Sequence, residues 1–148
     1  MAPLVVLLVV TGLVRLIGWL TGLDGIDSWS AATAYGLAVM FVMTSGTHFV
    51  PRRRAGFVAI VPPAIPAPGL VVTVTGVFEI AGAIGLLIPQ TRVLAAVCLG
   101  LLLLVMFPAN VYAAGAQRHP NAPHTPLLPR TVYQLMFLAA IIVTIWGS

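Results

Sequence analysis

Charged residues are scarce in this chain of 148 residues, which has seven arginines, three acidic residues and no lysine. Charged residues make up 7% of the chain and hydrophobic residues 60%, whereas about a quarter of the residues of a soluble domain are charged. So few charges could not cover the apolar core of a soluble protein of this size. The composition therefore excludes a soluble globular domain and indicates an integral membrane protein.

Cysteine is nearly absent as well, and Cys98 has no partner for a disulfide or a Cys-x-x-Cys pair. The chain therefore cannot carry out dithiol chemistry alone. Two of the three histidines, His119 and His124, are close in sequence, but Pro120 and Pro123 prevent one helix from presenting both to a metal, so no metal site is expected. The arginines are few and lie mostly at segment ends, which argues against a nucleic-acid partner.

Apolar residues gather in five runs that are long enough to cross a bilayer. They predict an all-α, single-domain membrane bundle with helices at about residues 3–23, 29–49, 70–89, 92–114 and 131–147. The first run is expected to be a membrane helix and not a signal peptide, because Arg15 interrupts it and no small-x-small cleavage site precedes Asp24. The apolar run within residues 55–69 is too short to cross a bilayer, and the segment is rich in proline, including Pro62 and Pro63. An interfacial or partly re-entrant segment is therefore expected there.

The arginines also predict an orientation. Five of the seven fall in the loops at 51–69 and 115–130, whereas the opposite loops carry Arg92 with Asp24 and Asp27. Cytoplasmic loops carry an excess of basic residues. We therefore expect the N-terminus in the cytoplasm, the C-terminus outside, and membrane lipids as partners of the whole bundle.

Glu79 is the only glutamate and lies in the middle of the 70–89 segment, roughly 9 residues or about 14 Å from either end. A carboxylate at that depth is costly, so it marks a functional or pairing site; the alternative is a protonated side chain that ties two helices together. Thr75, Gly76, Gly82 and Ala83 share its helix face. These small side chains allow another helix to come close.

Arg15 is the other charge inside an apolar run, roughly 12 residues from the cytoplasmic side or about 18 Å deep. We predict that it faces the bundle and neutralises Glu79. In the alternative, burial keeps Glu79 protonated, and Arg15 contacts backbone carbonyls or a lipid headgroup.

Further polar side chains are expected in the cytoplasmic half, namely His48, Asn110, Tyr133 and Gln134. Pro108 precedes Asn110 closely and lacks an N–H, so it should free a carbonyl and favour a kink in its helix. Together with Glu79 and Arg15, these polar residues form the candidate ligand-binding core.

Five short motifs occur in order along the chain: Gly46–Phe49, Val61–Pro66, Gly76–Gly82, Gly85–Pro89 and Phe107–Tyr112. Together they resemble the DoxX family of small bacterial membrane proteins, in the branch with a Phe-Pro-Ala-Asn motif. The resemblance implies a four-helix core at 29–49, 70–89, 92–114 and 131–147, located in the bacterial cytoplasmic membrane, with residues 1–23 as an added helix. The family is named after a subunit of a thiosulfate:quinone oxidoreductase, which implies a redox-linked role and a quinone-like ligand. His48, Glu79 and Asn110 occupy its recurrent polar positions.

Three functions stay open at this point. The first is a redox accessory subunit in which His48, Asn110, Tyr133 and Gln134 donate hydrogen bonds to a quinone-like ligand and Glu79 relays protons. A partner protein would then hold the redox centre, because the chain has no nucleotide fingerprint, no haem-type histidine pair and no cysteine cluster.

The second function is a non-enzymatic scaffold that binds a partner membrane protein or a second copy, and the third is a small proton-coupled carrier. No self-contained redox or hydrolytic motif decides whether the chain is an enzyme. A cavity that reaches Glu79 from the cytoplasmic side would favour the ligand-binding functions, whereas a closely packed Glu79 would favour the scaffold.

Overall fold

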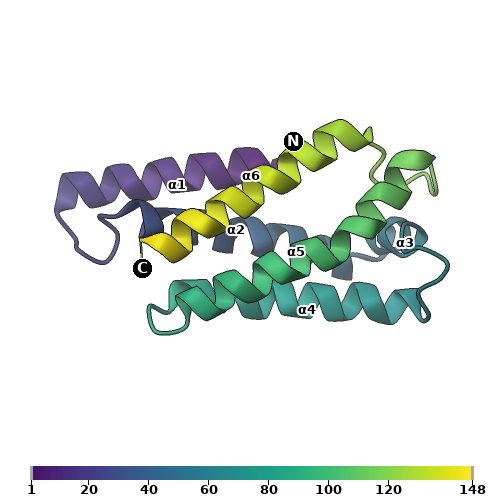
Figure 1. Ribbon diagram of the computed structural model, residues 1–148, viewed down its shortest axis with the longest axis horizontal. Coiled ribbons are helices and arrows are strands. Elements are labelled where there is room, and N and C mark those ends of the chain that lie inside the picture. Colours follow the sequence, from purple (N-terminus) through teal and green to yellow (C-terminus); the bar gives the residue numbers. More distant parts are fainter. Residues whose placement is uncertain (1, 148) are drawn as a thin grey trace.

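The computed structural model describes residues 2–147, which form six α-helices and no β-strand. The helices are α1 (Ala2–Thr21), α2 (Trp29–Phe49), α3 (Pro51–Ala59), α4 (Pro68–Leu87), α5 (Arg92–Gly115) and α6 (Leu127–Trp146). The five long helices run back and forth along the molecule, and the short α3 lies at one end (Figure 1). Four of them, α1, α4, α5 and α6, are long and apolar enough to cross a membrane. The all-α fold predicted from the sequence is confirmed, and the chain is a multi-pass membrane protein.

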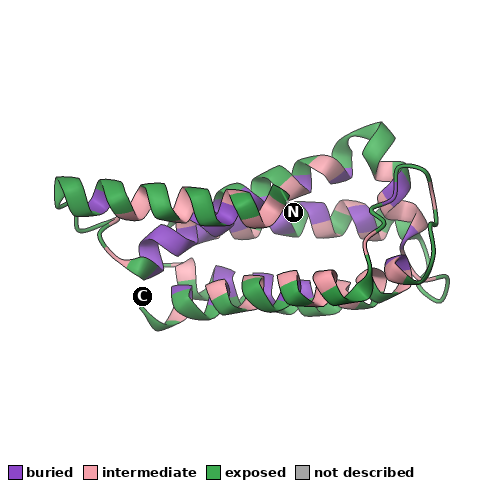
Figure 2. Cartoon of the chain, turned by 90° about the horizontal axis from the view of Figure 1, so that it is seen from above, coloured by how far each residue is buried: buried purple, intermediate pink, exposed green. Residues whose placement is uncertain are grey.

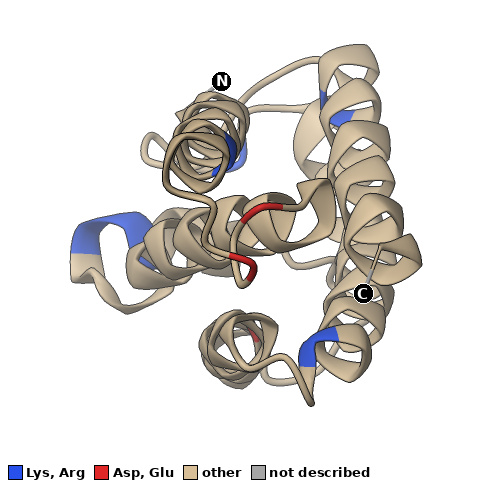
Figure 3. Ribbon diagram, turned by 90° about the vertical axis from the view of Figure 1, so that its left-hand side faces the viewer, with Lys and Arg blue, Asp and Glu red and all other residues tan. Residues whose placement is uncertain are grey.

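Helix α2 is the centre of the bundle. It packs against α1, α4 and α6, while α5 packs against α4 and α6. The helices α2, α4, α5 and α6 therefore form a closed ring, and α1 lies outside the ring against α2. The view along the helices in Figure 3 shows α1, which begins at the label N, on the outside of the molecule.

The central position explains why α2 is less apolar than its neighbours. More than half of its residues are buried, and the polar Thr33, Ser45 and His48 are among them. Figure 2 shows this helix as the most continuously buried one. Polar side chains on a membrane helix are tolerated where they face protein and not lipid. By contrast, the outer faces of the other long helices expose large apolar side chains such as Leu94, Val105 and Leu128.

The polypeptide between α2 and α4 differs from the single interfacial segment expected at 55–69. Helix α3 begins earlier, with Pro51 in its first turn and all three arginines of the Arg52–Arg54 run inside it. Pro62 and Pro63 lie in the turn that follows, and Pro68 starts α4. Proline suits the first turn of a helix because its missing N–H would have no helical partner there.

Helix α6 also begins earlier than predicted, at Leu127 and not at 131. Its first turn includes Pro129 and Arg130, which the sequence pattern had placed in the preceding loop. At the end of the molecule where α3 lies and α6 begins, a small apolar cluster is formed by Phe57, Ile60, Ala113 and Ala122. Helix α3 and the 116–126 segment therefore pack over one end of the ring.

Candidate functional site

Glu79 is buried between α4 and α2, with 4% of its surface exposed. Its Oε2 atom accepts a hydrogen bond of 3.2 Å from the hydroxyl of Thr44 on α2. The only ion pair within residues 2–147 joins Arg15 to Asp27, so Glu79 has no cationic partner in this part of the chain. The single glutamate thus connects two ring helices through a hydroxyl group.

His48 lies one turn beyond Thr44 on the same face of α2 and is also buried. A Cβ atom added at Gly76 would lie 3.0 Å from both Cβ and Nδ1 of His48, so the absence of a side chain at Gly76 makes room for the imidazole. The ring centroid of His48 is 4.8 Å from that of Phe57 on α3. Nδ1 of His48 is buried without a hydrogen-bond partner among the described residues.

Arg54 closes this region toward the α3 end of the molecule. Its Nη1 atom donates to the carbonyl of His48 at 3.2 Å and its Nη2 atom to the carbonyl of Gly69 at 2.7 Å. These bonds tie α3 to the end of α2 and the start of α4. We refer to Thr44, His48 and Glu79 as the α2/α4 polar cluster.

A separate set of polar contacts joins α5 to α6. Nη1 of Arg130 donates to Oδ1 of Asn110 at 3.0 Å, and Nε of Arg130 donates to the carbonyl of Thr125 at 2.9 Å. Gln134 is buried and donates to the carbonyl of Leu103 at 2.8 Å. Asn110, Arg130 and Gln134 form the α5/α6 polar cluster.

Pro108 lies inside α5, and the helix continues past it to Gly115. Proline cannot donate to the carbonyl four residues earlier, which is that of Leu104. The side chain of Gln134 donates to the carbonyl of Leu103, one residue before Leu104. The pairing of Gln134 with the helix that contains Pro108 was not foreseen from the sequence.

The prediction that Arg15 neutralises Glu79 is wrong. Arg15 pairs with Asp27, and its guanidinium lies 5.7 Å from the ring centroid of Trp29. Arg15 is closer to the end of α1 at Thr21 than to its start, so its long side chain reaches the α1–α2 loop. The loop folds back on α1 at Gly18, where an added Cβ would lie 2.6 Å from the carbonyl oxygen of Ile26.

The role of Arg130 was not predicted from the sequence, where this residue served only to predict the orientation in the membrane. The signal that could have found it is Asn110, because an amide inside an apolar helix requires a polar partner. Tyr133 is half-buried at the start of α6, and no hydrogen bond in the described part of the chain involves its hydroxyl. The predicted core is therefore divided into two polar clusters, with Arg15 at the opposite end of the bundle.

Two pockets on the surface of the bundle lie elsewhere. One is a groove of about 740 Å³ between α4 and α5, and the other is a pocket of about 310 Å³ between α1, α2 and α6. Neither is lined by Glu79, His48 or Asn110.

Comparison with known protein families gives one match, over residues 37–146, to a family described as a domain of unknown function (DUF8561). The chain belongs to the DUF8561 family. The DUF8561 match begins inside α2 and includes α3 to α6, whereas α1 lies outside it. The DoxX family that the five motifs resemble gains no support from this assignment.

Neither a curated protein nor a solved structure matches the chain.

Proposed function

We propose that this protein is a non-enzymatic membrane protein that binds a transmembrane helix of a partner protein in the groove between α4 and α5. The observation that carries the proposal is the shape and chemistry of this groove. It is about 740 Å³ in volume, lies between two candidate membrane-spanning helices and is lined almost entirely by apolar side chains. One of its few polar lining residues, Thr91, already donates its hydroxyl to the carbonyl of Gly85 at 2.9 Å.

Small residues form the floor of the groove. An added Cβ at Gly82 would lie 2.5 Å from Leu99, and one at Gly85 would lie 2.8 Å from the Cβ of Ala95. The two helix backbones therefore approach closely at these glycines. Ala81 and Cys98 are small and exposed beside them. Membrane helices associate through such small-residue surfaces because they maximise van der Waals contact.

Large side chains form the rims of the groove, among them Phe78, Leu101 and Val105. All three are more than half exposed in the isolated chain. Small residues between two rows of large apolar side chains leave room for a row of side chains from another helix. The partner surface that fits is therefore an apolar helix face.

The two polar clusters also support a non-catalytic role. Glu79 is bonded to Thr44, Asn110 to Arg130 and Gln134 to a backbone carbonyl. Each of these bonds joins two ring helices and contributes about 0.6 kcal/mol on average. The deep polar groups thus hold the ring together, and they do not converge on either of the two pockets.

The structure has a closed ring of α2, α4, α5 and α6 with α1 outside it, and membership of the DoxX family remains a prediction. A redox-linked role and a quinone-like ligand in the cytoplasmic half remain predictions that direct binding measurements could test. Among the described residues, no hydrogen bond joins His48 or Glu79 to Asn110 or Gln134, so these side chains add no support for the redox-linked role or the quinone-like ligand.

We also propose the orientation predicted from the arginines, with α2 as a fifth crossing. Arg52, Arg53, Arg54, Arg118 and Arg130 lie at the α3 end of the bundle, and Asp24, Asp27 and Arg92 at the other end. Figure 3 views the bundle from the end that carries the two aspartates. The α3 end is then cytoplasmic, in a bacterial inner membrane.

Cys98 provides the test, because it is the only cysteine in the sequence and lines the groove. A benzophenone maleimide attached to Cys98 in native membranes should give a discrete protein adduct on irradiation. The matched control is Cys98→Ala with Ile142→Cys, which moves the label to an exposed site on α6 outside the groove. Lipid adducts alone at both positions would contradict partner binding in the groove.

A further inference from the structure

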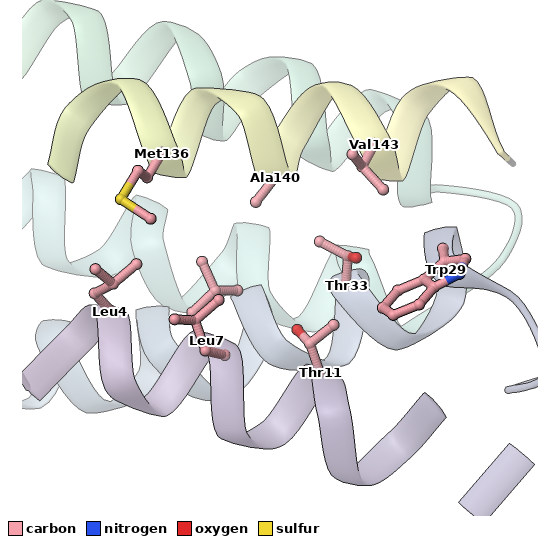
Figure 4. Close-up of a pocket in the computed structure, with 9 residues that line it drawn as sticks. Leu4, Leu7, Thr11, Trp29, Thr33, Met136, Ala140 and Val143 are labelled. Carbon is pink, nitrogen blue, oxygen red and sulfur yellow. The ribbon is translucent and has the colours of Figure 1, made fainter. Parts of the chain in front are cut away.

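The pocket between α1, α2 and α6 has no role in the proposed function. In Figure 4, Leu4, Leu7 and Thr11 of α1 face Met136, Ala140 and Val143 of α6, with Thr33 and Trp29 of α2 between them. Its volume of about 310 Å³ is at the lower end of the range for small-molecule sites, about 300–1,000 Å³.

This pocket depends on the part of the chain outside the family match. Six of its nine lining residues precede residue 37, where the match begins: Leu4, Leu7, Leu8, Thr11, Trp29 and Thr33. Gly36 sets the approach of α1 to α2, because an added Cβ there would lie 2.8 Å from the carbonyl oxygen of Leu7. Helix α1 thus adds a pocket to the ring.

Two buried polar atoms of α1 lack partners, one in a residue that lines the pocket and one in the next turn of the helix. Oγ1 of Thr11 and Nε of Arg15 have no hydrogen-bond partner among the described residues, and only one other buried side-chain atom there, in His48, shares this property. Thr11 and Arg15 are four residues apart on α1 and so lie on one face of it. The Arg15 guanidinium is next to Trp29, which lines the pocket. A buried donor without an acceptor is unfavourable, so an acceptor oxygen is favoured here.

We propose that this pocket binds an uncharged lipophilic molecule whose hydrocarbon body lies between α1 and α6 and whose ester, ketone or alcohol oxygen points toward Thr11 and Arg15. Oγ1 of Thr11 faces Gly36 of α2 in the structure, because a Cβ added at Gly36 would overlap with it. Thr11 lines the pocket, so the proposal requires its side chain to rotate to another staggered rotamer that turns the hydroxyl toward the ligand. Thr33 also lines the pocket, but most of the other lining residues are apolar, so the part of the ligand that lies against them must be apolar as well.

The head of the ligand is uncharged because the nearby charges are already balanced or negative. Arg15 is neutralised by Asp27, and Asp24 is exposed in the same loop. Because Arg15 is already paired, the described residues leave no uncompensated cation there for an acidic head. The rim residues Leu8 and Val143 are exposed, so a lipophilic molecule enters from the bilayer.

Native mass spectrometry tests this assignment. The full chain would be measured after extraction from native membranes, and again after delipidation and reconstitution into vesicles of dioleoylphosphatidylcholine. The wild type is expected to retain one lipophilic molecule per chain. A phosphatidylcholine mass from the vesicles would identify a phospholipid chain as the occupant, and a mass found only after native extraction would identify a separate lipophile.

Ala140→Phe fills the pocket and should reduce retention at least tenfold, and Thr11→Val should reduce it several-fold. Ala139→Phe is the matched control, because Ala139 is the exposed neighbour of Ala140 outside the pocket. If Ala140→Phe does not fold, Leu8→Trp narrows the exposed rim without changing the core. Retention unchanged in the pocket variants, no retained mass in the wild type, or a retained fatty acid would each overturn the proposal.

Discussion

The hydroxyl of Thr44 on α2 donates to the carboxyl group of Glu79 on α4 across 3.2 Å, and within residues 2–147 no other side chain hydrogen-bonds to Glu79. This contact places the only glutamate of the sequence at a helix interface, so its first role is to hold α2 against α4. His48 and Gly76 pack together one turn farther along the same interface.

Thr44→Val removes the donor to Glu79 and should lower the free energy of unfolding by about 1–2 kcal/mol, because a buried carboxyl group loses its partner. Unfolding in mixed micelles measures the change. Thr47→Val is the control, since Thr47 bonds only to the backbone of its own helix. Equal stability of the two variants would contradict a structural role for the Thr44–Glu79 bond.

Gly76→Ala should destabilise the protein by about 1–3 kcal/mol, because the added methyl group meets the His48 ring in a packed interface. Combining it with His48→Ala should recover part of the loss, which a double-mutant cycle measures. Gly46→Ala has open space around the new methyl group and should not destabilise α2. If Gly76→Ala and Gly46→Ala have the same free energy of unfolding, the close approach of His48 to Gly76 is not required for stability.

Arg15→Gln and Asp27→Asn should show a coupling energy of about 0.2–1 kcal/mol that decreases as salt is added, since this ion pair is partly exposed. Arg15→Gln and Glu79→Gln should instead be additive, because the two residues share no contact. The measurement is unfolding of the single and double variants at low and high salt. Coupling between Arg15 and Glu79 would restore the pairing predicted from the sequence.

Arg130→Gln should loosen the segment before α6, because Arg130 binds the carbonyls of Thr125 and Pro123 as well as Asn110. Faster amide hydrogen exchange over residues 119–126 is expected. The matched control is Arg118→Gln, which removes contacts to the backbone and ring of Tyr112 at the end of α5. The same exchange rates in both variants would argue against a specific role for Arg130.

The sequence predicted the long helices well, because apolar runs bounded by polar residues and prolines leave few alternatives in a membrane. The small neighbours of Glu79 also indicated correctly that another helix approaches it. The partner of Arg15 could not be predicted in the same way, since it depends on how the loop after α1 folds back onto Gly18. Helix α3 escaped detection because it is short and contains three arginines. The partners of Asn110 and Gln134 depend on helix rotation, which composition and spacing do not specify.

The position of α1 outside the closed ring has a consequence for membrane insertion. None of the contacts between neighbouring ring helices involves α1, so a chain that began at Ser28 should still close the ring. Loss of α1 would remove one candidate membrane crossing. If the ring kept its orientation, the new N-terminus would then lie on the opposite side of the membrane from the original one. Helix α1 therefore sets the side of the membrane on which the segment before the ring lies, and the same helix forms one wall of the pocket between α1, α2 and α6.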